Sequence, residues 1–119
     1  MWQMMRKMMA GVCFLLWVSQ VTAAVSVTDD EGYTVTLSHP AQRIVSLSPH
    51  ATEMVYAIGA GDRLVAVTSH SDYPEQARAL PVVGDFRQID MERVLALKPD
   101  LLVVWSGGSL PPQVEKLRQ

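Results

Sequence analysis

Three short runs of aliphatic residues recur along the chain, and they restrict its fold more than any other feature. The runs are "RIVSLS" (43–48), "RLVAVT" (63–68) and "LLVVW" (101–105). The second run has almost no polar alternation, which is typical of a strand that helices cover on both faces. Because helical patterns separate the runs, the sequence predicts an α/β fold with a small parallel sheet, flanking helices and right-handed crossovers.

Helical spacing follows the first run. Ser48 is suited to cap this helix and Pro49 to occupy its first position, and the glycines after residue 58 end it. We expect Met54, Val55 and Ile58 to form its buried face.

A second helical pattern precedes the third run. Asp90 provides an N-cap, and Lys98 before Pro99 ends the helix with a cation in its last turn. The residues expected on its buried side are Met91, Val94, Leu95 and Leu97. We expect the segment 69–88 to be a loop, "SGGSLPP" to be a turn, and "QVEKLRQ" (113–119) to begin another helix.

A β-hairpin is predicted ahead of the sheet. The stretch "VSVTDDEGYTVTLS" contains two short alternating strands around a turn that carries Gly32. The residues expected to face each other are Val25 and Val27 on one strand and Tyr33, Val35 and Leu37 on the other.

The first residues have the layout of a secretory signal peptide. Arg6 and Lys7 precede an apolar stretch that is shorter than the roughly 20 residues of a membrane-spanning helix, and Ala23 and Ala24 supply small residues for cleavage. A membrane anchor and a lipid on Cys13 are the alternatives. We expect a signal peptide over residues 1–23 and one exported domain over 24–119.

Charge and cysteine content restrict the partners of the exported part. Arg6 and Lys7 are two of ten basic residues, so eight would remain against twelve acids, a formal charge of −4. This balance argues against a nucleic-acid partner. Cys13 is the chain's one cysteine, so no disulfide is available after cleavage.

Ring side chains follow each predicted parallel strand, at the edge where ligands collect in open α/β sheets. They are His50, His70, Tyr73, Phe86 and Trp105. Taken singly, each has an ordinary explanation: Trp105 as a core residue, the histidines as solvated loop residues, and Tyr73 as a brace for its loop. Together they predict an aromatic-lined ligand cleft.

Catalytic interpretations have less support. A small hydrolase using Ser106 or Ser71 is the alternative, but the G-x-S-x-G elbow is missing and no base is assigned. A metal site from His39, His50 and His70 lacks a closely spaced ligand pair, and the glycines form no phosphate loop. We therefore expect neither an enzyme nor a resident cofactor.

The motifs "SPHATE", "SDYPE" and "MERVLALKPDLLVVW", the last followed by a glycine pair, occur in this order. Residues 25–119 thereby resemble the N-terminal lobe of the periplasmic cobalamin-binding proteins. These belong to a wider class that binds iron–siderophores, haem or cobalamin and feeds ABC importers. The resemblance implies a two-lobed protein that grips its ligand between the lobes, and the chain resembles one such lobe, incomplete and truncated relative to the family. We expect weak or undetectable ligand binding by these residues alone.

The resemblance also implies which residues contact the ligand. Carried over by position, they are His50, His70, Phe86 and Trp105. The family usually has tyrosine where His70 stands and tryptophan where Phe86 stands. Because imidazole is a good axial ligand for iron, His70 keeps haem open as the alternative to a corrinoid, and a ferric siderophore is a further alternative.

Glu92 stands where the family carries an acid that docks the lobe onto the membrane permease. An acid in the first turn of a helix also interacts favourably with the helix dipole, which is a purely structural alternative. The resemblance implies a monomeric periplasmic protein whose partner is the permease and ATPase complex of an ABC importer in the inner membrane.

Overall fold

The computed structural model describes residues 23–105 and 112–117. The signal peptide predicted over 1–23 lies outside this part except for Ala23, and Ser106 and the turn predicted at "SGGSLPP" also lie outside it except for Pro112. Within the described ranges, no helix has the length and apolar character needed to cross a bilayer.

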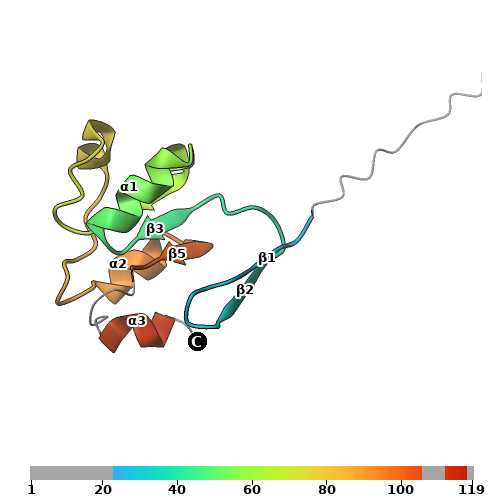
Figure 1. Ribbon diagram of the computed structural model, residues 1–119. Coiled ribbons are helices and arrows are strands. Elements are labelled where there is room, and N and C mark those ends of the chain that lie inside the picture. The colour runs from blue at the N-terminus through green and yellow to red at the C-terminus, as the bar shows by residue number, and fades with distance from the viewer. Residues whose placement is uncertain (1–22, 106–111, 118–119) are drawn as a thin grey trace, which may run out of the picture.

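A three-stranded parallel sheet forms the centre of the fold (Figure 1). Its strands are β3 (Ile44–Ser46), β4 (Leu64–Ala66) and β5 (Leu101–Val103), in the order β4-β3-β5. The parallel sheet is confirmed, although each strand is shorter than its apolar run. One reason is that Arg63 belongs to a 3₁₀ turn, η1 (Gly61–Arg63), rather than to β4.

Helix α1 (Pro49–Ala57) begins where the sequence predicts. The Ser48 hydroxyl accepts a hydrogen bond from the Ala51 N–H at 3.1 Å, and Pro49 occupies the first helical position. The predicted buried face is wrong in part, because Met54 is 49 % exposed and Ile58, which is the C-cap, is 79 % exposed. The residues buried on α1 are Ala51, Thr52 and Val55.

Helices α2 (Met91–Ala96) and α3 (Pro112–Leu117) are short. The Asp90 carboxylate accepts a hydrogen bond from the Arg93 N–H at 3.1 Å, which confirms the predicted N-cap. The predicted stripe is wrong for Leu95, which is 63 % exposed, because only one side of so short a helix faces the sheet. Val94 is fully buried, and Met91 and Leu97 are half-buried.

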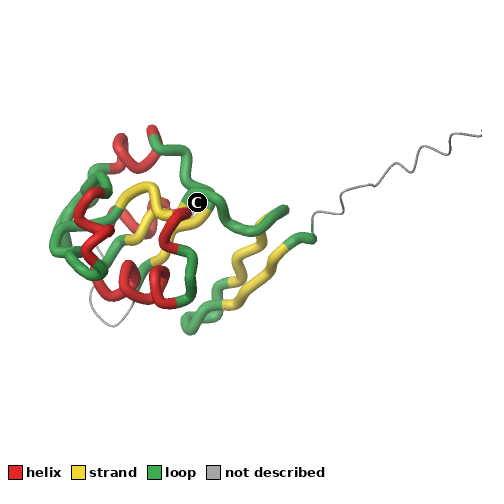
Figure 2. The backbone as a smooth tube through the Cα atoms, turned by 90° about the horizontal axis from the view of Figure 1, so that it is seen from above, coloured by secondary structure: helices red, strands yellow, loops and turns green. Residues whose placement is uncertain are grey.

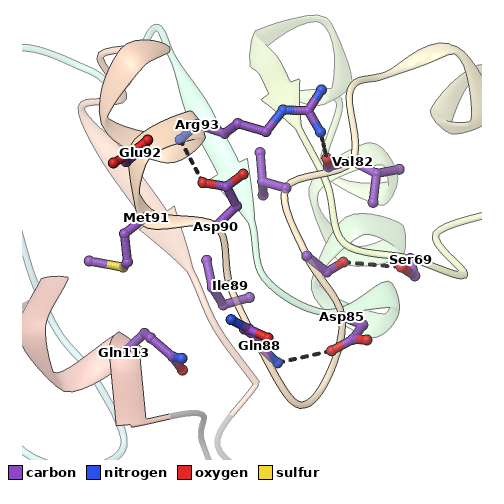
Figure 3. Close-up of a pocket in the computed structure, with 12 residues that line it drawn as sticks. Ser69, Val82, Asp85, Gln88, Ile89, Asp90, Met91, Glu92, Arg93 and Gln113 are labelled. Atoms are coloured by element: carbon purple, nitrogen blue, oxygen red, sulfur yellow. Dashed lines mark hydrogen bonds between the residues drawn. The ribbon is translucent and has the colours of Figure 1, made fainter.

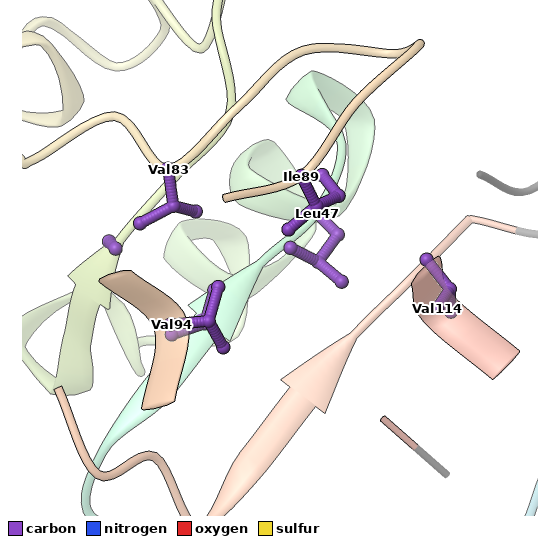
Figure 4. Packing of buried hydrophobic residues seen from close by; sticks show 7 residues of the cluster. Leu47, Val83, Ile89, Val94 and Val114 are labelled. Atoms are coloured by element: carbon purple, nitrogen blue, oxygen red, sulfur yellow. The ribbon is translucent and has the colours of Figure 1, made fainter. Parts of the chain in front are cut away.

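Apolar side chains form a separate core on each face of the sheet. Ile44 of β3 and Leu64 of β4 pack with Val55 of α1 on one face. On the other face, β3 and β4 pack with α2, α3 and the segment before α2 (Figure 4). The residues of this second core are Val45, Leu47, Ala66, Val83, Ile89, Val94 and Val114. Alternate strand residues therefore point to opposite helical layers.

The predicted hairpin forms a two-stranded sheet of its own beside the parallel sheet, as Figure 2 shows. Strand β1 (Val25–Thr28) pairs antiparallel with β2 (Thr34–Leu37), so that Val25 faces Leu37 and Val27 faces Val35. Tyr33 was expected inside this pairing, but it precedes β2. Its carbonyl instead accepts a hydrogen bond from the Asp29 N–H across the turn.

The segment 69–88 is more ordered than the predicted loop. It contains a 3₁₀ helix, η2 (Glu75–Ala79), and two isolated bridges pair Val67 with Val82 and Gly84 with Ile89. The Ser69 N–H donates to the Gly84 carbonyl at 2.8 Å. These contacts fix the chain that follows β4 against the chain that precedes α2.

A polar clasp joins the start of β3 to the start of β5. The Asp100 carboxylate accepts from the N–H groups of Gln42 and Arg43 at 2.8 and 2.9 Å, and the Arg43 guanidinium donates to the Leu97 carbonyl. Burial opposes ionisation of Asp100, but these backbone donors outweigh it and lower the pKa of the carboxyl below its ordinary value.

Candidate functional site

The chain leaves β3, β4 and β5 at one edge of the sheet, because the three strands are parallel. Strand β3 is central, so the chain that leaves it toward α1 starts between the ends of β4 and β5. Backbone pairing continues beyond β3, where the Leu47 N–H donates to the Val103 carbonyl at 2.9 Å. This edge carries three of the four ring residues named as ligand contacts, and the fourth lies in the following loop.

His50 and Trp105 contact each other at this edge. Their ring centroids lie 4.3 Å apart and their planes meet at 80°, an edge-to-face arrangement. Trp105 remains 52 % exposed, so the ordinary explanation of this tryptophan as a core residue is wrong. The pair presents an exposed ring surface between β3 and β5.

A buried hydroxyl network fixes the backbone beneath His50, and no sequence pattern predicted it. The Thr52 hydroxyl lies 2.9 Å from the Ser46 hydroxyl and 3.2 Å from the Ser71 hydroxyl. The Ser46 hydroxyl donates to the Ser48 carbonyl at 2.9 Å. The network ties α1 to the segment that carries His70. The signal in the sequence was Ser46, a polar residue within the apolar run 43–48.

His70 lies exposed just after β4, with φ of 67°, in the left-handed region that few residues other than glycine adopt. Its neighbours in sequence, Ser69 and Ser71, are both hydrogen-bonded, to Gly84 and Thr52 respectively. Tyr73 is 70 % exposed and therefore does not act as a packed brace. The bonds on either side hold His70 at the surface.

A tight loop over residues 84–89 presents Phe86 to solvent. The Asp85 carboxylate accepts from the N–H groups of Arg87 and Gln88 at 2.8 and 2.9 Å, and these bonds lower the pKa of Asp85 below its ordinary value. The N–H and the hydroxyl of Ser69, the residue before His70, both donate to the Gly84 carbonyl, so His70 follows directly on the base of this loop. Phe86 is 74 % exposed, and the Arg87 guanidinium carbon lies 5.1 Å from its ring centre.

The predicted ligand residues thus form two groups, His50 with Trp105 and His70 with the Phe86 loop. Across residues 23–105 and 112–117, no direct ring contact joins the groups. The hydrogen bond between Thr52 and Ser71 connects the elements that carry them. The same described ranges hold no cluster of histidine, cysteine, aspartate and glutamate fit for a metal ion.

Glu92 is exposed in the first turn of α2, on an open groove of about 730 Å³ (Figure 3). The groove runs between the segment 82–90, α2 and the Gln113 side chain of α3, and Figure 3 shows Glu92 at its margin beside Asp90 and Arg93. None of the four ring residues lines it. A second hollow, of about 460 Å³, includes His70.

Ser71 lacks the surroundings of a catalytic nucleophile. It is 5 % exposed, and its hydroxyl is hydrogen-bonded to Thr52. Among the residues that the structure describes, no histidine donates to it or accepts from it. A nucleophilic serine needs a base within hydrogen-bond reach.

The sequence model of the family described as periplasmic binding protein matches residues 44–119. The chain therefore belongs to the periplasmic binding protein family, a family of binding proteins rather than of enzymes. A vitamin B12-binding protein of Vibrio cholerae is 54 % identical over 80 residues, which cover 67 % of this chain and 29 % of that relative. The chain thus spans less than a third of the length of the relatives it matches.

Solved structures give the same family. The periplasmic vitamin B12-binding protein BtuF of Vibrio cholerae matches with a TM-score of 0.64 and 54 % identity, over 67 % of this chain and 31 % of that one. The periplasmic haem-binding protein RhuT of Roseiflexus sp. RS-1 matches with a TM-score of 0.59 and 34 % identity, over 66 % of this chain and 30 % of that one. Both the fold and the family are thereby confirmed.

Proposed function

We propose that this chain is the substrate-binding component of an ABC importer, exported to the periplasm, where it binds a corrinoid and delivers it to the membrane permease. The observation that carries the proposal is the exposed ring surface at the carboxyl edge of the sheet, in a chain 54 % identical to a vitamin B12-binding protein. No step of this function changes a covalent bond of the ligand.

His50, His70, Phe86 and Trp105 form the ligand-binding wall in this proposal. Trp105 and Phe86 are 52 % and 74 % exposed, and exposed aromatic faces gain free energy when a large planar ligand covers them. The larger groove is lined by charged residues, including Asp85, Asp90 and Glu92, and by no aromatic ring, so it offers a macrocycle no ring to stack on. We therefore place the ligand at the rings rather than in the groove.

Haem is the alternative ligand, and His70 is the observation that favours it. Its imidazole is exposed at the candidate site, where it could supply an axial ligand to iron, and a solved relative with 34 % identity is a haem-binding protein. A shift of the haem absorption band that disappears in H70A would assign the ligand to haem. A corrinoid titration unaffected by H70A, without any haem shift, would exclude this role.

Glu92 docks the lobe onto the permease in this proposal. Its carboxylate is exposed and accessible to a cationic partner, and such pairs mainly steer and orient association. We expect E92Q to reduce salt-sensitive association with the permease without altering ligand binding. Equal association of E92Q and the unchanged chain would reject this role.

Export depends on residues 1–23, which we propose to be a cleaved signal peptide. The mass of the mature protein recovered from the periplasm tests this directly. A product that begins at Ala24 supports the proposal, and a product that retains Met1 contradicts it.

Equilibrium dialysis of the full chain against cyanocobalamin tests the binding function. Stacking on Trp105 is worth about 1.4 kcal/mol, so W105A should weaken binding about tenfold. Y33A is the matched control, because Tyr33 is also 52 % exposed but lies in the hairpin. Equal affinities of W105A and Y33A would contradict the placement. Absence of corrinoid binding by the unchanged chain at ligand concentrations high enough to detect weak binding would contradict the function.

A further inference from the structure

Arg87 occupies an unusual position for an exposed cation. Its guanidinium carbon lies 5.1 Å from the centre of the Phe86 ring, and Phe86 is itself 74 % exposed. Among the described residues, no acceptor receives a hydrogen bond from the Arg87 side chain, and no carboxylate lies within ion-pair distance of it. The cation therefore keeps its donors unused beside an exposed ring.

The loop that carries Arg87 is closed by its own hydrogen bonds. The Asp85 carboxylate accepts from the backbone N–H groups of Arg87 and Gln88, and the Asp85 N–H donates to the Gln88 carbonyl at 2.9 Å. Gly84 bridges to Ile89 at the base of the loop. A loop ordered in this way loses little conformational entropy when a ligand binds to its tip.

Asp85 is the acid nearest to Arg87 in sequence, and its charge is already engaged. Its carboxylate accepts two backbone N–H bonds, and these donors are the main cause of its lowered pKa. The charges of Arg87 and Asp85 still interact, but no described carboxylate lies within ion-pair distance of the Arg87 guanidinium, so its donors remain open to an external anion.

We propose that Arg87 binds an anionic group at the edge of a planar ring ligand that stacks on Phe86. This inference rests on the proposed function and assigns one determinant of its specificity. A guanidinium is planar and permanently charged, and it binds phosphate or carboxylate through two parallel hydrogen bonds while it stacks on an aromatic face. The anion is the phosphodiester of a corrinoid or a carboxylate of haem.

Two pairs of ligands distinguish the corrinoid phosphodiester from the haem carboxylate. Cyanocobalamin carries the phosphodiester and dicyanocobinamide lacks it. Haemin carries two carboxylates, and a derivative in which both are converted to uncharged hydrophilic amides lacks them. The binding of each ligand to the full chain and to R87Q is measured by equilibrium dialysis, and the loss caused by R87Q is compared within each pair.

R87Q should weaken the binding of either cyanocobalamin or haemin, whichever is the ligand, by about five- to tenfold. The reason is that a charge-assisted hydrogen bond is lost at a solvent-exposed rim. Its uncharged counterpart should bind R87Q and the unchanged chain equally, and R87K should lie between, because lysine keeps the charge without the planar fork. R63Q is the matched control, since Arg63 ends η1 at the opposite edge of the sheet.

The outcomes distinguish a wrong role for Arg87 from a wrong binding function. An equal loss for the charged and uncharged ligands, or no loss at all, overturns the role of Arg87 while leaving the binding function intact. Failure of the unchanged chain to bind any of the four ligands, at concentrations high enough to detect weak binding, overturns the proposed function and the role of Arg87 with it. A loss confined to haemin assigns the anion to its carboxylates.

Discussion

Replacing Thr52 by valine removes one hydroxyl from the buried network that ties α1 to the segment carrying His70. Thr52 is fully buried, and valine fills nearly the same volume, so the change leaves the packing of the α1 face intact. It leaves the Ser71 hydroxyl, itself 5 % exposed, without its hydrogen bond to Thr52, and it removes the contact with Ser46.

The expected cost follows from these lost contacts. A buried hydroxyl left without a partner costs about 1 to 3 kcal/mol, so T52V should lower the free energy of unfolding by about that amount. T36V is the matched control, because the Thr36 hydroxyl contacts Ser26 on the exposed face of the hairpin, where water replaces it. Urea unfolding of both variants, followed by circular dichroism, gives the two free energies.

A second readout separates the network's positioning role from its effect on stability. If the network holds the segment 69–72 against α1, amide protons of that segment should exchange faster in T52V than in T36V. Equal unfolding free energies and equal exchange in the two variants would refute the argument that these hydroxyls fix the site.

Two further perturbations test the clasp at Asp100 and the loop at Gly84. D100N should lower the free energy of unfolding by about 1 kcal/mol at neutral pH, because Asp100 accepts two backbone hydrogen bonds as a carboxylate. The folded-state pKa of Asp100 is lowered, so its contribution is present above its ordinary pKa of 3.8 and is lost as the pH falls through the folded-state value. Unfolding curves across this range should therefore converge for D100N and the unchanged chain, and a constant difference would contradict this. G84A should lower the melting temperature more than G59A, because both glycines have positive φ but only at Gly84 would a Cβ meet backbone atoms, those of Gln88 and Ile89. Equal decreases in melting temperature would contradict this, because they would show that the loop can move to accommodate the added Cβ.

Local signals in the sequence predicted the helix starts, whereas burial depended on the assembled layers. Ser48 and Asp90 cap their helices through bonds to residues three positions on, which a local pattern can encode. Met54 and Leu95 have the spacing of buried residues, yet both are exposed because the narrow sheet covers only one side of each helix. Helical spacing alone does not indicate how wide the sheet is, and therefore does not show which side chains it covers.

The sequence likewise predicted one part of the candidate site and not the other. Parallel topology was enough to predict that His50 and Trp105 share an edge, and the structure places their rings in contact. The proximity of His70 to the Phe86 loop depends on backbone bonds between Ser69 and Gly84, fifteen residues apart, within a segment predicted to be irregular. Side-chain bonds such as that from Thr52 to Ser71 leave no periodic signature in a sequence.

The most direct test of the central claim is to map where a corrinoid touches the chain. Side-chain NMR resonances of His50, His70, Phe86 and Trp105 are followed as cyanocobalamin is added to the labelled full chain, a measurement that also detects weak binding. We expect saturable shifts at these four rings and little change at Met91 and Gln113, which line the groove beside α2. Shifts confined to that groove, or the absence of any saturable shift, would contradict it.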